Sequence, residues 1–176
     1  NPDHPGTRIV LKHSSDEFPV VGIAGDSGFV SINMSKYLMN REIGFGRKVL
    51  QILEELNIGW EHMPTGIDDL SIILRSRELT PIKEEEILRQ LVQKAEVDHA
   101  EIEHDLSIIM IVGEKMKRHI GVTATATRAL SENNINIQMM SQGSSEVSIM
   151  FVVQKDQEKA AIKALYQAFF GESKEG

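Results

Sequence analysis

An internal repeat constrains this chain more than any other feature of its sequence. When the sequence is compared with itself at an offset of 77 residues, Met39–Leu74 aligns with Met116–Phe151 without a gap. The sequence therefore predicts two related modules within its 176 residues. The identical pairs include Ile43/Ile120, Gly44/Gly121, Asn57/Asn134, Ile58/Ile135, Met63/Met140 and Gly66/Gly143.

The first copy shows the pattern strand, helix, strand, strand, helix, strand. Its first helix has an apolar face with helical spacing, and Pro64 and Gly66 mark a turn between its short middle strands. Thr80 and Pro81 suit the start of the second helix, as cap and first helical residue. The expected elements are a strand at Phe29–Ser35, a helix from Gly44 to Asn57, strands at Ile58–Met63 and Asp69–Leu74, a helix from Thr80, and a strand at His99–Glu103.

The second copy lacks a final strand. Gly171–Gly176 is too short and too polar to supply one, whereas Thr7–Lys12 and Pro19–Ala24 have strand character and belong to neither copy. We therefore expect Val20–Ile23, with Ile9–Leu11 as a hairpin partner, to complete the second sheet. The other expected elements are strands at Leu106–Val112, Ile135–Met140 and Glu146–Val153 and helices at Val122–Asn133 and Asp156–Phe170.

These elements predict an α+β fold of two ferredoxin-like βαββαβ modules with antiparallel sheets, the first inserted in the sequence of the second. The first module is expected to comprise residues 29–104. The second is expected to comprise residues 1–28 together with residues 105–176, and a strand from about residues 19–24 completes its sheet.

The charge balance argues against a polyanionic partner. The chain has 19 basic and 26 acidic residues, a formal net charge of −7, and only 5% aromatic residues for stacking on bases. It has no cysteine, which excludes disulfides and cysteine-bound metals. Its apolar runs, such as Leu106–Val112, are shorter than a membrane span. We expect a cytoplasmic protein with no nucleic-acid or membrane partner.

The glycine-rich segment Gly44–Lys48 has more than one interpretation. It lacks the spacing and the terminal Ser or Thr of a Walker A phosphate loop. Since Gly44 and Gly121 both precede the first helix of a module, the backbone N–H groups at these helix starts could instead hold a carboxylate. A tight turn with a purely structural role is the alternative.

No cluster of titratable residues predicts catalysis. Glu101, Glu103 and Asp105 alternate along one predicted strand beside His104, and solvated charges explain them more simply than a metal site. His62 has no nucleophile at a matching spacing. We therefore expect neither catalytic residues nor a metal site.

Five segments carry a family resemblance: Asn1–Thr7, Ser35–Asn40, Gly44–Lys48, Gly66–Asp69 and Gln142–Ser148. In this order they resemble the regulatory region of monofunctional aspartokinases, which contains tandem ACT domains, and Asn1–Thr7 resembles the junction after the kinase domain. The family phosphorylates the side-chain carboxylate of aspartate with ATP. Its ACT modules bind end-product amino acids, usually at an interface between two chains, and inhibit the kinase.

The resemblance implies a regulatory region with several partners. These are an amino-acid effector, lysine or threonine, a second copy bound through the ACT modules, and a kinase domain in the full-length chain. No cofactor is implied for this region, because ATP and Mg²⁺ are expected only with the kinase domain. The alternative is a structural ACT dimerisation region that binds no ligand.

By position, the resemblance implies an effector site in the first module, between the loop after its first strand and its second strand. Loop N–H groups would hold the ligand carboxylate, and Glu61 or Asp69 would pair with an ammonium group, which favours lysine. Alternatively, Glu61 is only an exposed strand residue. The implied residues are Met39, Arg41, Glu42, Gly44, Phe45, Gly46, Glu61, His62, Pro64, Thr65 and Asp69.

The second module has a matching site with a different charge. Gln138 replaces Glu61 there, so a cationic side chain loses its partner. A neutral ligand such as threonine fits this site better, or the site is empty and structural. The implied residues are Met116, Gly121, Val122, Asn136, Ile137, Gln138 and Gln142.

Overall fold

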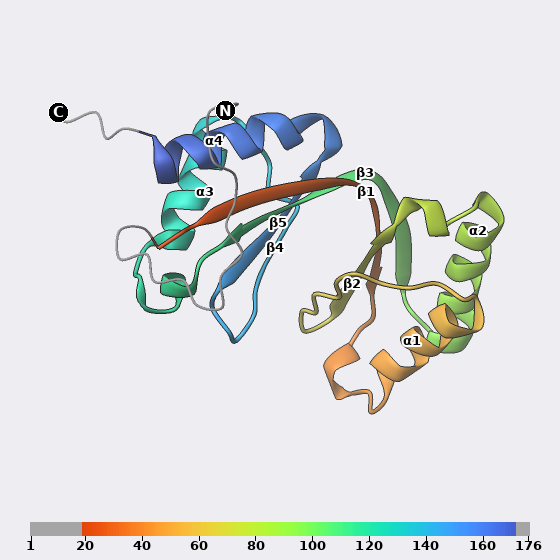
Figure 1. Ribbon diagram of the computed structural model, residues 1–176. Helices are drawn as coiled ribbons and strands as arrows, with labels where there is room; N and C mark the ends of the chain where they lie inside the picture. Colours follow the sequence, from red (N-terminus) through yellow and green to blue (C-terminus); the bar gives the residue numbers. More distant parts are fainter. Residues whose placement is uncertain (1–18, 172–176) are drawn as a thin grey trace.

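Two long strands organise the molecule. The computed structural model describes residues 19–171, and in it β1 (Gly22–Ser35) and β3 (His99–Val112) each span 14 residues. The two strands pair antiparallel from Gly22 opposite Val112 to Ser35 opposite His99. Figure 1 shows both strands passing from one half of the molecule into the other. They therefore belong to both modules.

The repeat extends into these strands. β3 begins and ends 77 residues after β1, so the two paired strands occupy equivalent positions in the repeat. Antiparallel pairing of equivalent strands relates the two modules by an approximate two-fold axis. Phe29 and Leu106, which are also equivalent, lie opposite each other near the centre of the pair.

The sheet has five antiparallel strands in the order β2-β1-β3-β5-β4. β2 (Asp69–Arg75) pairs with the Phe29–Ser35 half of β1, whereas β5 (Ser148–Gln154) pairs with the Leu106–Val112 half of β3 and is followed by β4 (Met139–Gln142). Each half of the sheet has the strand order of a ferredoxin-like module. The predicted α+β class with antiparallel sheets is confirmed.

The segment that precedes the first module lies beside the second. Gly22–Ser27 pairs with Ser107–Val112, and the N–H of Val21 donates to the carbonyl of Val112 at 2.8 Å. Val20 is fully buried in the core of the second module. This is the position at which the second sheet needs its last strand. The expected hairpin segment Thr7–Lys12 and the junction-like Asn1–Thr7 lie outside the described residues.

Both long strands contain an irregularity where the modules meet. Gly28 has a φ of 87° and Asp105, its repeat equivalent, has a φ of 56°. The register of β1 against β3 shifts on either side of Phe29. Bulges of this kind bend a strand and increase its twist without ending the ladder. For that reason the separate strands expected at Pro19–Ala24 and Phe29–Ser35 form one strand, as do those expected at His99–Glu103 and Leu106–Val112.

Helices cover one face of each half of the sheet (Figure 1). The first module has α1 (Phe45–Glu55) and α2 (Pro81–Gln90), and a π-helical turn (Leu91–Ala95) follows α2. As predicted, Thr80 caps α2, its hydroxyl accepting from the N–H of Lys83 at 3.3 Å. The remaining helices are α3 (Val122–Glu132), α4 (Glu158–Phe170) and the 3-10 turns Met39–Arg41, Ser76–Glu78, Glu114–Arg118 and Lys155–Gln157.

Each module has its own core beneath its helices, and the two modules share a third. The shared core comprises Phe29, Ile73, Leu106 and Val152, which are all buried. Phe29 alternates along β1 with Val30, which packs in the core of the first module, so the shared core lies on the opposite face of the sheet. Among residues 19–171, no helix is both long and apolar enough to cross a membrane.

The second strand of each module differs from the prediction. The strand expected at Ile58–Met63 is reduced to one isolated bridge, His62 with Ile73, and a second isolated bridge, Thr65 with Leu70, lies in the segment expected to be a turn. Pro64, between the two bridges, has no N–H to donate to a ladder. In the second module the strand expected at Ile135–Met140 begins later, at Met139.

Gly113→Ala tests the docking of the N-terminal segment on the second module. A Cβ at Gly113 would lie 1.9 Å from the backbone oxygen of Pro19, so this segment must move away. We expect the free energy of unfolding to fall by about 1–3 kcal/mol in denaturant titration. Gly143→Ala is the control, because a Cβ there meets nothing within 4 Å. Equal stability of the two variants would contradict the observed path of the segment.

Candidate functional site

Equivalent loops lead into the first helix of each module. Gly44 and Gly121, with φ of 84° and 98°, are the N-caps of α1 and α3. This left-handed conformation favours glycine at both positions. Neither helix has a side-chain cap, so N–H groups of each first turn could receive an anion, although in α1 the N–H of Phe45 donates to the carbonyl of Glu42 at 3.3 Å.

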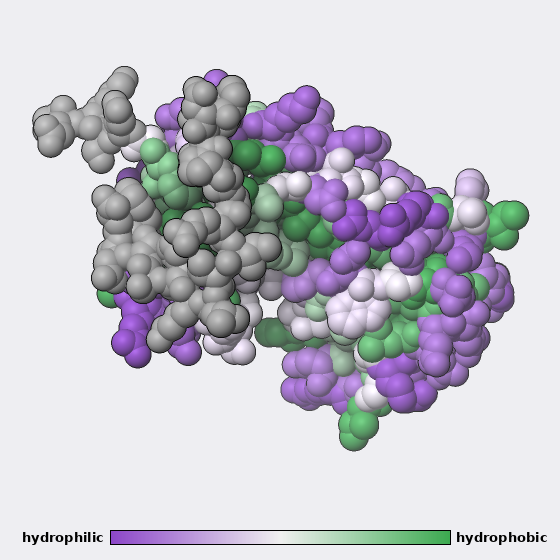
Figure 2. All heavy atoms as spheres, viewed as in Figure 1, coloured by the Kyte–Doolittle hydropathy of each residue, from purple (hydrophilic) through white to green (hydrophobic). Residues whose placement is uncertain are grey.

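Each loop contains one buried and one exposed apolar side chain. Met39 and Met116 are 6% and 4% exposed and anchor the loops in the two module cores. Ile43 and Ile120 are 99% and 98% exposed. Figure 2 shows apolar surface projecting at the end of the first module where its loop lies in Figure 1. Because an exposed isoleucine contributes nothing to the core, its presence in both loops marks them as candidate contact surfaces.

Three charged side chains close the loop of the first module. The carboxylate of Glu42 lies 2.5 Å from Lys36 Nζ and 2.7 Å from Lys48 Nζ. Lys36 also donates to the carbonyl of Ala95 at 2.8 Å. Hydrogen bonds from the two lysines hold the pKa of Glu42 below its usual value. Glu42 therefore holds the loop closed and does not face it as a free acid.

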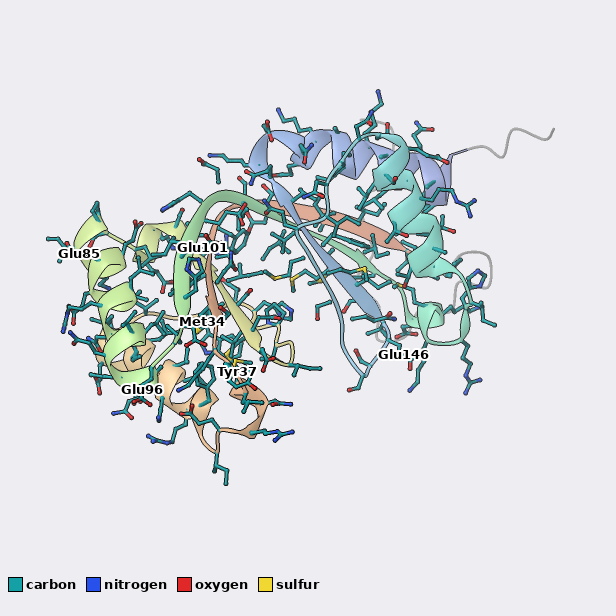
Figure 3. The ribbon with its side chains drawn as sticks, turned by 180° about the vertical axis from the view of Figure 1, so that it is seen from behind. Met34, Tyr37, Glu85, Glu96, Glu101 and Glu146 are labelled. Carbon is teal, nitrogen blue, oxygen red and sulfur yellow. The ribbon has the colours of Figure 1, made fainter. Side chains whose placement is uncertain are left out.

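The loop of the second module is open instead. The residues equivalent to Lys36, Glu42 and Lys48 are Gly113, His119 and Thr125, which cannot form the same cluster. An open hollow of about 750 Å³ lies beside this loop. Figure 3 shows Glu146 at the connection between β4 and β5, and Glu146 also lines the hollow. The lining includes four predicted residues, Met116, Gly121, Val122 and Gln142, and adds Lys117, Arg118, His119, Ser144 and Glu146, which the sequence analysis missed.

The structure divides the predicted residues of the first module into two groups. The turn after Thr65 lies beside the loop, where the N–H of Asn40 donates to the carbonyl of Ile67 at 3.2 Å. The backbone N–H of Glu61 instead donates to the carbonyl of Ile73 at 2.8 Å. Ile73 is four residues beyond Asp69, the first residue of β2, so Glu61 lies about 13 Å along the strand from the loop. The loop group comprises Met39, Arg41, Glu42, Gly44, Phe45, Gly46, Pro64, Thr65 and Asp69, and the distant group comprises Glu61 and His62.

The second module divides in the same way. Met116, Gly121, Val122 and Gln142 share the hollow beside the loop. Asn136 and Ile137 line a different hollow of about 540 Å³ against α3. Gln138 lines neither of these hollows, because its side chain turns toward Glu103, to which it donates a hydrogen bond at 2.5 Å. One chain therefore does not assemble either predicted site.

The two residues of the distant group have different surroundings. Glu61 is exposed and accepts a hydrogen bond from Nε of Arg75 at 2.9 Å. Nε2 of His62 is buried and has no partner within the described part of the chain. Burial lowers the pKa of His62, which favours its neutral form.

The residues considered for a metal are spread over the surface. His104 lies 3.6 Å from Glu84 of α2, and His99 lies 3.6 Å from Glu101. Between residues 19 and 171, no three His, Asp or Glu side chains are grouped so that they could hold a metal ion.

Comparisons with known proteins agree with this architecture. The sequence profile of the ACT domain matches residues 109–169. Aspartokinase 3 of Bacillus subtilis (strain 168) is 52% identical over 170 residues, which are 97% of this chain and 37% of that protein. The crystal structure of aspartate kinase from Clostridium acetobutylicum matches with a TM-score of 0.84 and 34% identity, over 90% of this chain and 37% of that chain. The ligand-free regulatory subunit of aspartate kinase from Thermus thermophilus matches with a TM-score of 0.70 and 25% identity, over 86% of this chain and 98% of that chain.

The chain is therefore an ACT-domain protein. More particularly, it is homologous to the aspartokinases, and its match covers 98% of a solved regulatory subunit of aspartate kinase. It spans 37% of the length of the Bacillus relative.

Glu42→Gln tests the charge cluster in the first loop. Since the folded-state pKa of Glu42 is lowered, its contribution to stability is present above the usual value of 4.5 and is lost as the pH falls through the lowered pKa. We expect a lower melting temperature than that of the wild type at pH 7, and a difference that shrinks as the pH falls below about 4. Glu54→Gln on α1 is the control, and a difference independent of pH would contradict the prediction.

Proposed function

We propose that this chain is the allosteric region of an aspartokinase and that it binds an end-product amino acid for feedback control of aspartate phosphorylation. Lysine is the proposed effector of the first module. The observation that carries the proposal is the repeated loop, in which a left-handed glycine, an uncapped helix start, a buried methionine and an exposed isoleucine recur at equivalent positions. In the full-length protein, a kinase domain would respond to this region.

The division of each predicted site supports an effector bound between two copies of the chain. The loop group can receive the carboxylate of an amino acid at a helix N-terminus. Glu61 can receive an ammonium group, but it lies about 13 Å along the strand from the loop of its own chain. A second copy could bring its Glu61 to this loop, and the exposed Ile43 would be covered in the same contact.

The charges of the two modules support different ligands. The first module carries the carboxylates of Glu61, Asp68 and Asp69 along its second strand, turn and third strand, which suits a cationic ligand. The hollow of the second module has Lys117 and Arg118 in its lining against one carboxylate, Glu146. These residues disfavour a second lysine, so threonine or another neutral amino acid is the proposed ligand there.

Titration of the chain with amino acids tests the effector. We expect lysine to bind more tightly than threonine or methionine in isothermal titration calorimetry. Glu61→Ala should weaken lysine binding by about tenfold or more, because a charged hydrogen bond is lost. Glu85→Ala is the control, because Figure 3 shows Glu85 on the outer side of α2, away from the sheet.

Failure to detect heat with any of the three amino acids, from a folded dimer, would contradict the proposed effector. That result would favour the alternative function, a structural dimerisation region without a ligand. Unchanged lysine affinity in Glu61→Ala would contradict only the assignment of Glu61.

Ile43→Glu tests the contact between two copies. A charge on a side chain that is covered in the dimer should weaken association by about tenfold or more in sedimentation equilibrium. Ile82→Glu is the matched control, because Ile82 is an isoleucine of α2 that is 81% exposed but lies outside the loops. Equal association of the two variants would exclude the first loop from the interface.

A further inference from the structure

A charged cluster joins the two modules at the bend of β1. Arg75, the last residue of β2, lies 2.9 Å from Glu61 of its own module. It also lies 2.7 Å from Asp26, in the part of β1 that pairs with the second module. The guanidinium of Arg75 stacks on the ring of Phe29, 4.2 Å from its centroid. The same side chain therefore contacts the proposed effector acid, the bend and the other module.

A second cluster joins the modules at the bend of β3. Glu103 lies in the part of β3 that belongs to the first module, opposite Ser31. Its Oε1 accepts hydrogen bonds from Gln138 at 2.5 Å and from Gln154 at 3.0 Å, and both glutamines belong to the second module. This cluster also connects the second strand of one module with the last strand of the other.

The two clusters are related by the repeat. Asp26 and Glu103 are 77 residues apart, as are Glu61 and Gln138, and as are Gly28 and Asp105, the two bend residues with positive φ. In the second module, Gln138 contacts Glu103 of the first module directly. In the first module, Glu61 is joined to Asp26 of the second module through Arg75. Both clusters therefore connect a predicted effector residue with the other module at equivalent positions of the repeat.

We propose that these two clusters are clamps that set the angle between the modules, and that Arg75 makes the first clamp responsive to a cationic ligand. The first clamp comprises Asp26, Arg75 and Glu61, and the second comprises Glu103, Gln138 and Gln154. The response to a ligand depends on the proposed function, whereas the control of the angle does not. A ligand ammonium that takes Glu61 leaves Arg75 bound to Asp26 alone and changes the forces at the bend.

The charges of the first clamp support such an exchange. One guanidinium lies between two carboxylates, so the clamp keeps one negative charge that is not compensated within it. A second cation near Glu61 completes the neutralisation, and Arg75 retains Asp26 as its partner. Both contacts are partly exposed to solvent, which keeps the cost of the exchange low.

The second clamp has no comparable exchange. Glu103 is held by two neutral amides, and the residue equivalent to Arg75 is the buried Val152. A ligand cation cannot displace another cation there. The first clamp is therefore the ligand-sensitive one, and the second fixes the opposite side of the bend.

The angle between the modules can be measured directly, because the chain has no cysteine of its own. Glu85→Cys on α2 and Lys159→Cys on α4 would carry spin labels on different modules, diluted with unlabelled chain to remove contributions between copies. Without ligand, Arg75→Met and Asp26→Asn should each broaden or shift the distance distribution. Arg77→Met, two residues further along the chain, is the control and should leave the distance distribution unchanged. Distributions identical to that of the wild type in both clamp variants would overturn the proposal.

Lysine titration separates the clamp from the proposed function. Arg75→Met should raise lysine affinity by about two- to fivefold, the size expected when one partly exposed ion pair no longer competes for Glu61. Asp26→Asn, which leaves the contact between Arg75 and Glu61 in place, should leave the affinity within twofold of the wild type. Equal affinity of the wild type and Arg75→Met would overturn the exchange at Glu61. Absence of lysine binding to the wild type would contradict the proposed effector, and the distances without ligand would still test the clamps.

Discussion

The antiparallel pairing of β1 with β3 is the constraint on which the rest of the molecule depends. Two repeat-equivalent strands of 14 residues share one ladder of backbone hydrogen bonds, and each contributes one half to each module. The modules therefore cannot separate without breaking that ladder. The ladder is irregular at Gly28 and Asp105, where the register shifts and the backbone has positive φ, so we expect relative motion of the modules at this bend. Every contact that spans this bend therefore acts on the angle between the two modules.

The shared strands also explain which parts of the fold could be predicted from the sequence. The helix starts at Gly44, Thr80 and Gly121 depend on local chemistry, and they lie within one residue of the prediction. Val20 could be placed beside the second module because the second copy lacked a strand. The fusion of neighbouring strands could not be predicted, because a bulge at Gly28 resembles a turn in the sequence.

The candidate sites were harder to predict than the fold. Residue positions carried over from a family indicate which side chains take part, but not which chain supplies each of them. Glu61 and Gly44 were expected in one site, and the path of the second strand places them at opposite ends of the module. The partner of Glu61 was also missed, because only the pairing of β1 with β2 brings Arg75 next to the bend. Lys117 and Arg118 could have been found, since they directly follow Met116 in the repeat.

The two modules kept the same backbone while their charges diverged. The loop of the first module is closed by Lys36, Glu42 and Lys48, and the equivalent loop of the second leaves an open hollow. A ligand can change the quaternary state of a protein only by the difference in its affinity for the two states, typically about 1–3 kcal/mol. Two modules with identical sites would respond to the same ligand on both sides of the bend. Unequal sites would make the response one-sided, because in the proposed clamps a cation at Glu61 would change one side of the bend while the amides around Glu103 hold the other.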